Sequence, residues 1–330
     1  MSTIARQTWF DGTMMPSEQA TLPVMTSGLH YGVAVFEGIR CFGTDAGPAI
    51  FRLRDHMLRL LASARVLGFR DLPWDVDLLT SAAKQVVHAN DLTECYVRPV
   101  IYLGDGGWNL TIDSGVPHVA IGAWEWSDFM SEEAAERGVR AHVSSFTRHH
   151  PNVAMTKAKI AGNYANSVLA RTECVRLGFD EAIMLDPQGF VAECTGENLF
   201  LVEHGALITP PSASVLEGIT RDSLISLASR MGLAVHERTI SRDQLYLADE
   251  LLLCGTAADV VAVREVDHRQ IAAGAAGPVT RALQREYRSV IRGFHPLSAQ
   301  WLDPIGSGVP VAAGAERHDL HAELGYGHGV

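Results

Sequence analysis

Hydrophobic and polar positions alternate with a period of two in many short segments of this chain, and with a period near 3.6 in a few longer ones. In the first part of the chain, the short patterns predict strands over 9–15, 29–40, 49–53, 95–103 and 118–126. The first of these is a hairpin, because Asp11-Gly12 separates two apolar runs. Helices are expected over 55–67, with Asp55 as cap and Gly68 as stop, and over 75–90.

The second part of the chain repeats this mixture. The patterns predict strands over 140–146, 181–185, 190–193, 198–203, 206–209, 233–236 and 250–254, and a small hairpin over 266–271. Helices are predicted over 164–177, over 220–231 with Thr220 as a plausible cap, and over 278–292. Pro99 inside the strand 95–103 favours an edge position or a bulge there. The fold class is therefore α+β, with helices and strands mixed.

A change of character in the chain suggests two domains. The stretch 128–138 is polar and is interpreted as a linker between a small α/β domain, residues 1–127, and a larger β-rich domain with flanking helices, residues 139–303. The tail 304–330 is rich in Gly, Ala and His, so we expect it to be disordered.

Composition narrows the class of function. The chain has 330 residues, 47% of them hydrophobic, with a net charge of −11, and it has neither a long basic run nor a membrane-length apolar stretch. Nucleic-acid and membrane binding are therefore disfavoured. The five cysteines are scattered, without metal spacing, and no secretory signal is evident, which predicts a cytoplasmic protein. The histidines show no metal motif, so no metal is expected.

The segment Ala154–Asn166 holds the first candidate for chemistry. Its lysines, Lys157 and Lys159, precede a predicted helix, and a tyrosine follows at Tyr164. A lysine amine in an apolar pocket loses its proton more readily, which suits it to Schiff-base chemistry. An ordinary surface lysine is the competing interpretation, and the segment alone does not decide between them.

Several other residues could bind an anion. Arg59 faces away from the apolar stripe of its helix, toward either solvent or a bound anion, and Arg98 lies within an apolar strand without an acidic neighbour in sequence. Gly218-Ile219-Thr220 and Gly255-Thr256 place hydroxyl and backbone N–H groups where phosphate binds well. If Glu193, at a strand end, faced a pyridine nitrogen, the whole set would suit pyridoxal phosphate.

The motifs resemble those of the branched-chain-amino-acid aminotransferases, which are class IV pyridoxal-phosphate enzymes of fold type IV. The class signature is complete from Glu193 through Asn198-Leu199-Phe200 and Thr209 to Gly218 and Arg221. The runs Phe36-Glu37-Gly38-Ile39-Arg40 and Tyr96-Val97-Arg98-Pro99 resemble this subgroup in particular. The resemblance implies transamination of leucine, isoleucine or valine with 2-oxoglutarate, in a homodimer or a larger assembly of dimers.

The resemblance also implies roles for individual residues. It makes Lys159 the catalytic lysine, because Lys159, not Lys157, stands five residues before Tyr164. For the cofactor, pyridoxal 5'-phosphate, it implies Arg59, Lys159, Tyr164, Glu193, Leu216, Gly218, Ile219, Thr220, Gly255 and Thr256. For amino-acid and 2-oxo-acid substrates it implies Tyr31, Phe36, Arg40, Tyr96, Arg98, Trp108, Trp126, Phe129, Thr256 and Ala257.

Two positions depart from the pattern of the subgroup. Phe129 stands where a tyrosine is common, and the loop Gly107-Trp108-Asn109 is bulkier and more polar than the small apolar turn expected there. A specialised amino-acid substrate therefore stays open. Enzymes of the same fold, a D-amino-acid aminotransferase or an aminodeoxychorismate lyase, are alternatives, as is a non-catalytic phosphate-binding protein.

Overall fold

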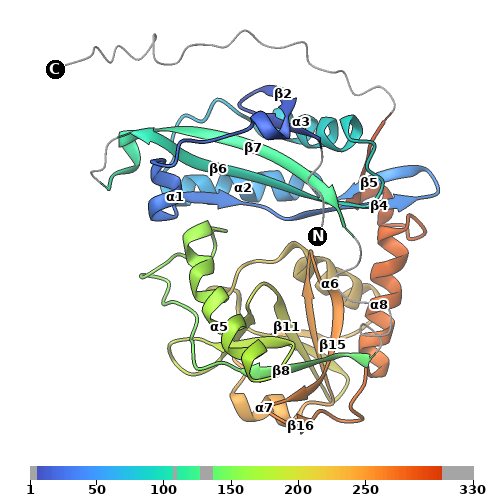
Figure 1. Cartoon of the computed structure of the whole chain (residues 1–330). Coiled ribbons are helices and arrows are strands. Elements are labelled where there is room, and N and C mark those ends of the chain that lie inside the picture. The colour runs from blue at the N-terminus through green and yellow to red at the C-terminus, as the bar shows by residue number, and fades with distance from the viewer. Residues whose placement is uncertain (1–5, 107–109, 127–136, 307–330) are drawn as a thin grey trace, which may run out of the picture.

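Two β-sheets, one above the other in Figure 1, organise the chain. The computed structural model describes residues 6–106, 110–126 and 137–306. The mixture of helices and strands confirms the predicted α+β class. Within these ranges, none of the helices combines the length and the apolar character that crossing a bilayer requires.

The first sheet has eight strands in the order β17-β5-β4-β6-β7-β1-β2, with β3 also paired to β6. Its strands are β1 (Gln7–Phe10), β2 (Thr13–Pro16), β3 (Ala34–Phe36), β4 (Ile39–Thr44), β5 (Gly47–Phe51), β6 (Cys95–Gly106), β7 (Gly115–Glu125) and β17 (Leu302–Pro304). The predicted hairpin over 9–15 is confirmed as β1 and β2, and both Asp11 and Gly12 have a positive φ, as the tight turn requires.

Helices α2 (Leu53–Leu67) and α3 (Val76–Ala89) pack on one face of this sheet. Alternate residues of β6, among them Val97 and Ile101, point toward the helices, so the core between them is fully buried. Asp75 caps α3 by accepting a hydrogen bond from Leu78 N at 2.8 Å, and Gly68 ends α2 at a φ of 109°. Asp55, predicted as the cap of α2, lies inside its first turn instead, because Arg52 precedes the helix.

The second sheet has nine strands in the order β10-β9-β8-β15-β14-β11-β12-β13, with β16 on β15. Its strands are β8 (Val139–Val143), β9 (Glu181–Leu185), β10 (Val191–Cys194), β11 (Asn198–Glu203), β12 (Ala206–Thr209), β13 (Val235–Glu237), β14 (Glu250–Gly255), β15 (Asp259–Val266) and β16 (Arg269–Gln270). Strand β11 is buried on both faces: Phe200 joins the cluster under α6 and α8, and Leu199 and Leu201 join a second cluster on the other side.

Helices flank this second sheet (Figure 1). They are α5 (Tyr164–Arg176), α6 (Ile219–Arg230), α7 (Arg242–Leu247) and α8 (Pro278–Ile291), with the short α1 (Ser27–Tyr31) and α9 (Ser298–Trp301) elsewhere in the chain. The predictions for α5 and α8 are confirmed almost to the residue. Gly218, not Thr220, is the N-cap of α6, and Thr220 is buried within the first turn.

The prediction of one strand over 29–40 is wrong. The segment forms α1, which ends at Gly32 with a φ of 67°, and then two short strands, β3 and β4, separated by Glu37 and Gly38. Gly38 passes against the ring of Tyr96 so closely that a Cβ there would lie 1.8 Å from the phenol oxygen. Alternation of residue types could not reveal this break, because its causes are contacts with distant parts of the chain.

Two further expectations need correction. The strand that contains Pro99 is internal to the sheet, so the edge position is wrong; Pro99 instead lies opposite the gap between β3 and β4, where Glu37 N donates to its carbonyl oxygen at 3.0 Å. The strand β15 was not predicted, although its sequence, DVVAVREV, is β-branched and apolar.

The end of the described chain returns to the first sheet. Strand β17 pairs with β5, and Trp301 packs edge-on against Phe51 with ring centroids 6.0 Å apart. Phe51 and Phe42 of the first sheet belong to the cluster that α6 and α8 form with the second sheet, so one core spans both. The proposed division at 128–138 stays a prediction, and residues 127–136 and 307–330 lie outside the described residues.

Candidate active site

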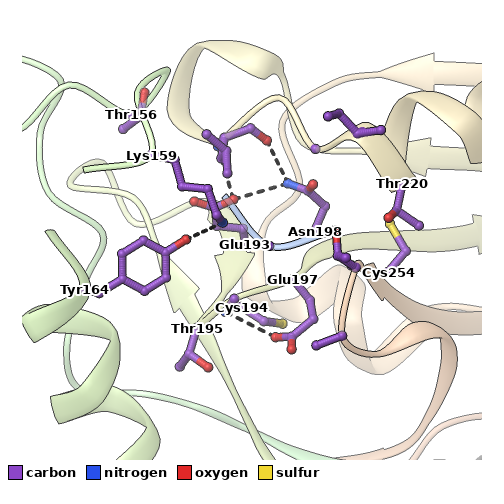
Figure 2. Close-up of a pocket in the computed structure, with 18 of the residues that line it drawn as sticks. Thr156, Lys159, Tyr164, Glu193, Cys194, Thr195, Glu197, Asn198, Thr220 and Cys254 are labelled. Atoms are coloured by element: carbon purple, nitrogen blue, oxygen red, sulfur yellow. Dashed lines mark hydrogen bonds between the residues drawn. The ribbon is translucent and has the colours of Figure 1, made fainter. Parts of the chain in front are cut away.

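All the residues predicted to bind the cofactor line one cavity between the two sheets. Its lining includes Arg59, Tyr96, Lys159, Tyr164, Glu193, Leu216, Gly218, Ile219, Thr220, Gly255, Thr256 and Ala257. Figure 2 shows Lys159 and Tyr164 on one side of the cavity and Thr220 on the other, with Glu193 and Asn198 between them. These side chains come from separate elements of the chain, so only the tertiary fold brings them together.

Lys159 enters the cavity because its neighbours are held elsewhere. Ala158 and Ile160 are buried in the core of the first sheet, so the side chain between them points the opposite way in this extended segment. Its backbone is fixed at both ends: Lys159 N donates to Ser63 Oγ at 3.0 Å, and Lys159 O accepts from Phe36 N at 3.1 Å. Its Nζ donates to the phenol oxygen of Tyr164 at 2.7 Å (Figure 2).

Lys157 occupies a different position. Its Nζ donates to the carboxylate of Glu217 at 2.6 Å, and the side chain is 42% exposed and outside the cavity lining. The structure therefore separates the two lysines of the segment, one inside the cavity and one at the surface.

Glu193 is a buried carboxylate that reaches the cavity from the end of β10. A register shift between Val191 and Glu193 disturbs the ladder where the strand delivers this residue. One carboxylate oxygen lies 2.7 Å from Arg148 Nη2, and the other accepts from Leu216 N at 3.1 Å and Asn198 Nδ2 at 3.2 Å. Burial raises the pKa of Glu193, while the Arg148 guanidinium and the Leu216 N–H oppose that rise.

The far side of the cavity is built from backbone. Gly218 precedes the first turn of α6, and a Cβ at Gly218 would lie 2.0 Å from Asn198 Oδ1, so this close approach requires glycine. The N–H groups at the start of a helix lack intrahelical acceptors, and with the hydroxyl of Thr220 they form a setting that favours an anion. The turn Gly255-Thr256-Ala257, which follows β14, closes the same side.

Arg59 does not face open solvent, which was one of its two predicted alternatives. Its Nε and Nη2 donate to Glu37 at 2.6 and 2.8 Å, and its Nη1 donates to Glu217 O at 2.8 Å. The side chain lines the cavity next to the start of α6. Burial would raise the pKa of Glu37, but Arg59 and His56 hold it well below its ordinary value, so Glu37 stays ionised.

The predicted substrate residues lie in several places. Tyr96 lines the cavity, and Phe36 borders it, with its ring 4.8 Å from that of Tyr164. Arg98 lies 4.8 Å from the ring of Phe36, and its Nε is buried without a hydrogen-bond partner among the described residues. Trp126 packs against Tyr96 with ring centroids 4.8 Å apart. Phe36, Arg98 and Trp126 are neighbours of Tyr96 or Tyr164 but are not part of the cavity lining, and Arg98 lines a separate hollow on the first sheet.

Two further predicted substrate residues also lie away from the cavity. Arg40 is buried over the ring of Phe42, 3.8 Å from Asp259, and Tyr31 is 45% exposed beside a separate hollow. Trp108 and Phe129 lie outside the described residues. Roles for all of these side chains stay predictions.

The structure adds polar residues that the sequence did not single out. Arg148 has no local sequence signal, since its partner, Glu193, is distant along the chain. Asn198 and Glu37 lie within the motifs on which the family resemblance rests, but the resemblance assigned no role to either residue. A search for invariant polar positions within those motifs is the signal that could have found them.

The chain matches known proteins over most of its length. A family model described as amino-transferase class IV matches residues 34–266. A branched-chain-amino-acid aminotransferase of Pseudomonas aeruginosa is 44% identical over 293 residues, which cover 89% of this chain and 95% of that protein.

Solved structures show the same similarity. The branched-chain amino acid aminotransferase of Escherichia coli has a TM-score of 0.88 and 42% identity, covering 92% of this chain and 100% of that chain. The branched-chain amino acid aminotransferase of Thermobaculum terrenum, in its holo form with pyridoxal phosphate, has a TM-score of 0.85 and 35% identity, covering 92% of this chain and 99% of that chain. The similarity extends over both sheets and therefore over the whole cavity.

Removing the cation beside Glu193 should make stability more dependent on pH. In Arg148→Met the pKa of Glu193, already raised by burial, should rise further, so ionised Glu193 destabilises the folded state above that pKa. We expect a loss of roughly 3–5 kcal/mol of unfolding free energy at about pH 8 and a smaller loss at about pH 5. Urea unfolding at both pH values measures it.

The matched control is Arg54→Met, which breaks the exposed ion pair with Asp77 and should show no such pH dependence. An Arg148→Met variant whose stability loss is the same at both pH values would contradict the assigned coupling to Glu193.

Proposed function

The chain belongs to the class IV aminotransferase family, and from that premise we propose that it transaminates branched-chain L-amino acids with 2-oxoglutarate, using pyridoxal 5'-phosphate. The products would be branched-chain 2-oxo acids and L-glutamate. The observation that carries the proposal is the convergence of the Lys159 amine, the Tyr164 phenol and the buried Glu193 carboxylate on one cavity, opposite a helix start.

The residues present fit this cofactor. An amine for its aldehyde, a phenol for its ring oxygen and a carboxylate for its ring nitrogen are supplied by Lys159, Tyr164 and Glu193. The N–H groups that begin α6, with Arg59, Thr220 and Thr256, supply donors for its phosphate. When bound, the cofactor would supply a store for the amino group and for the electron pair left at the substrate Cα.

Lys159 would move the proton in each half-reaction. Its Nζ would act first as a base, taking the proton from the substrate Cα, and then as an acid, delivering that proton to a neighbouring atom. One flexible side chain can reach both positions. The phenol of Tyr164, 2.7 Å from that nitrogen, would hold the amine at the reacting face between these events. The fixed backbone of Lys159 limits the amine to a short arc, which keeps both proton transfers on one face of the substrate.

Glu193 would help the ring of the cofactor to withdraw electrons from the substrate Cα. A carboxylate beside the ring nitrogen favours the protonated ring, which draws electrons away from Cα. Arg148, Leu216 N and Asn198 fix this carboxylate in one orientation, so no reorganisation is needed as charge develops.

Beside the cavity, aromatic rings and Arg98 would receive an apolar substrate side chain and a second carboxylate in turn. Phe36, Tyr96 and Trp126 offer aromatic walls to a branched aliphatic group. Arg98 stands against two of these rings with an unsatisfied Nε, which a carboxylate at the distal end of glutamate or 2-oxoglutarate could satisfy.

We also propose a homodimer and a cytoplasmic location. A second copy would cover an apolar surface beside a hollow on the open face of the first sheet. The exposed apolar side chains there are Leu22, Val24, Met25 and Leu29. A solution mass near the 35.8 kDa of one chain would contradict the dimer. All five cysteines are free and buried, as suits a reducing compartment.

The two lysines of the segment test the assignment of the cofactor. Lys159→Ala should abolish covalent attachment of pyridoxal phosphate and with it transamination, whereas Lys157→Ala should retain both, because Lys157 contacts Glu217 at the surface. Borohydride reduction followed by peptide mass spectrometry reads out the attachment. A label found on Lys157, or on no lysine in the parent protein, would overturn the proposal.

Arg98 tests the site for the distal carboxylate. Arg98→Met keeps much of the side-chain volume but removes the guanidinium, so the KM for 2-oxoglutarate should rise at least about tenfold while the KM for leucine changes by less than about threefold. Steady-state kinetics with each substrate varied in turn measure the split. An equal rise in both constants would assign Arg98 a structural role only.

A further inference from the structure

Glu37 is a fully buried carboxylate directly behind the cavity wall, next to the lining residues Gly38 and Arg59. It lies in the break between β3 and β4, where its backbone N–H donates to Pro99 O at 3.0 Å. The break turns its side chain onto α2, away from the ladder of the sheet. Burying a charge at a strand interruption costs free energy unless partners compensate it, so the contacts of Glu37 indicate its role.

Glu37 holds two residues of one helix face. Its carboxylate accepts from Arg59 Nε at 2.6 Å and Nη2 at 2.8 Å, a bidentate pair, and it lies 2.8 Å from His56 Nδ1. His56 and Arg59 are three residues apart on α2 and therefore share one side of that helix. His56 is buried, and its burial lowers its pKa although Glu37 opposes the shift, so it is a neutral donor to the ionised carboxylate.

Counting donors shows what this arrangement leaves available. A guanidinium has five N–H groups. Among the described residues, Arg59 donates one from Nε and one from Nη2 to Glu37, and one from Nη1 to Glu217 O at 2.8 Å. One N–H therefore remains on each of the two terminal nitrogens, and both are available as charged donors to a phosphate.

We propose that Glu37, supported by His56, is a positioning residue that fixes the guanidinium plane of Arg59 so that its remaining N–H pair meets the cofactor phosphate. The proposal rests on the proposed function, since it takes pyridoxal phosphate as the ligand. Glu37 acts through Arg59 and does not itself contact the phosphate.

Removing the charge of Glu37 should change the affinity for phosphate in opposite directions under the two explanations, electrostatic repulsion and positioning of Arg59. Glu37 is negative, as is phosphate, so charge alone predicts tighter phosphate binding when Glu37 becomes neutral. If Glu37 instead fixes Arg59, its loss frees the guanidinium to rotate and weakens binding. Only the part of the affinity that comes from the phosphate should change.

The experiment compares two probes on the apo-protein: pyridoxal 5'-phosphate and pyridoxal, which lacks the phosphate. In Glu37→Gln, the Kd for pyridoxal phosphate should rise at least about tenfold, while the Kd for pyridoxal changes by less than about twofold. Glu203→Gln, which neutralises an acid in a surface ion pair with Arg238, is the matched control and should leave both constants unchanged.

His56→Leu is a second variant, useful if Glu37→Gln does not fold. Because His56 is neutral, this change leaves the net charge as it is, so charge alone predicts no effect and positioning predicts a rise of about threefold for pyridoxal phosphate only. Circular dichroism checks the fold of each variant.

Each remaining outcome contradicts the proposal. Positioning is excluded if Glu37→Gln binds pyridoxal phosphate as tightly as the parent or more tightly, and His56→Leu binds it unchanged. If both probes bind more weakly to the same extent, Glu37 has a structural role only. These results leave the proposed function intact if the parent protein binds pyridoxal phosphate more tightly than pyridoxal. A parent that does not distinguish the two probes would overturn both the inference and the phosphate site.

Discussion

The short pairing between the lysine segment and the first sheet is the contact on which the rest of the site depends. Lys159 O accepts from Phe36 N, Ile160 bridges to Val35, and the flanking apolar side chains lie in the core of the first sheet. The amine itself meets Tyr164, the first residue of the helix α5 that packs on the second sheet. One extended segment thus belongs to one half of the molecule through its backbone and to the other through its functional side chain.

Charge in the cavity is arranged on a common plan. Two ion pairs border the cavity, Glu193 with Arg148 and Arg59 with Glu37, and Glu193 and Arg59 each still present an edge toward the space for the cofactor. Unpaired, such charges would destabilise the fold or shift their protonation. Paired on one side, they are oriented in advance, which is the condition for electrostatic catalysis.

Local patterns predicted much of the architecture, and long-range contacts account for what they missed. Both α3 and α8 have an amphipathic stripe and a start signal in their own sequence, the Asp75 cap for α3 and Pro278 at the first position of α8, so their limits were predictable. The break at Glu37 and Gly38 depends on Tyr96 and Arg59, and alternation alone could not predict it. Site residues were predicted mainly through the resemblance, since spacing alone left Lys157 and Lys159 undecided, and the partners Arg148 and Asn198 needed the structure.

The central claim is that both half-reactions take place in this one cavity, and a single spectroscopic cycle tests it most directly. The purified protein with pyridoxal phosphate should absorb visible light, lose that absorbance on addition of leucine, and regain it on addition of 2-oxoglutarate, because the amino group is stored and then passed on. If leucine leaves the spectrum unchanged, or 2-oxoglutarate does not restore it, the account of a branched-chain aminotransferase is contradicted.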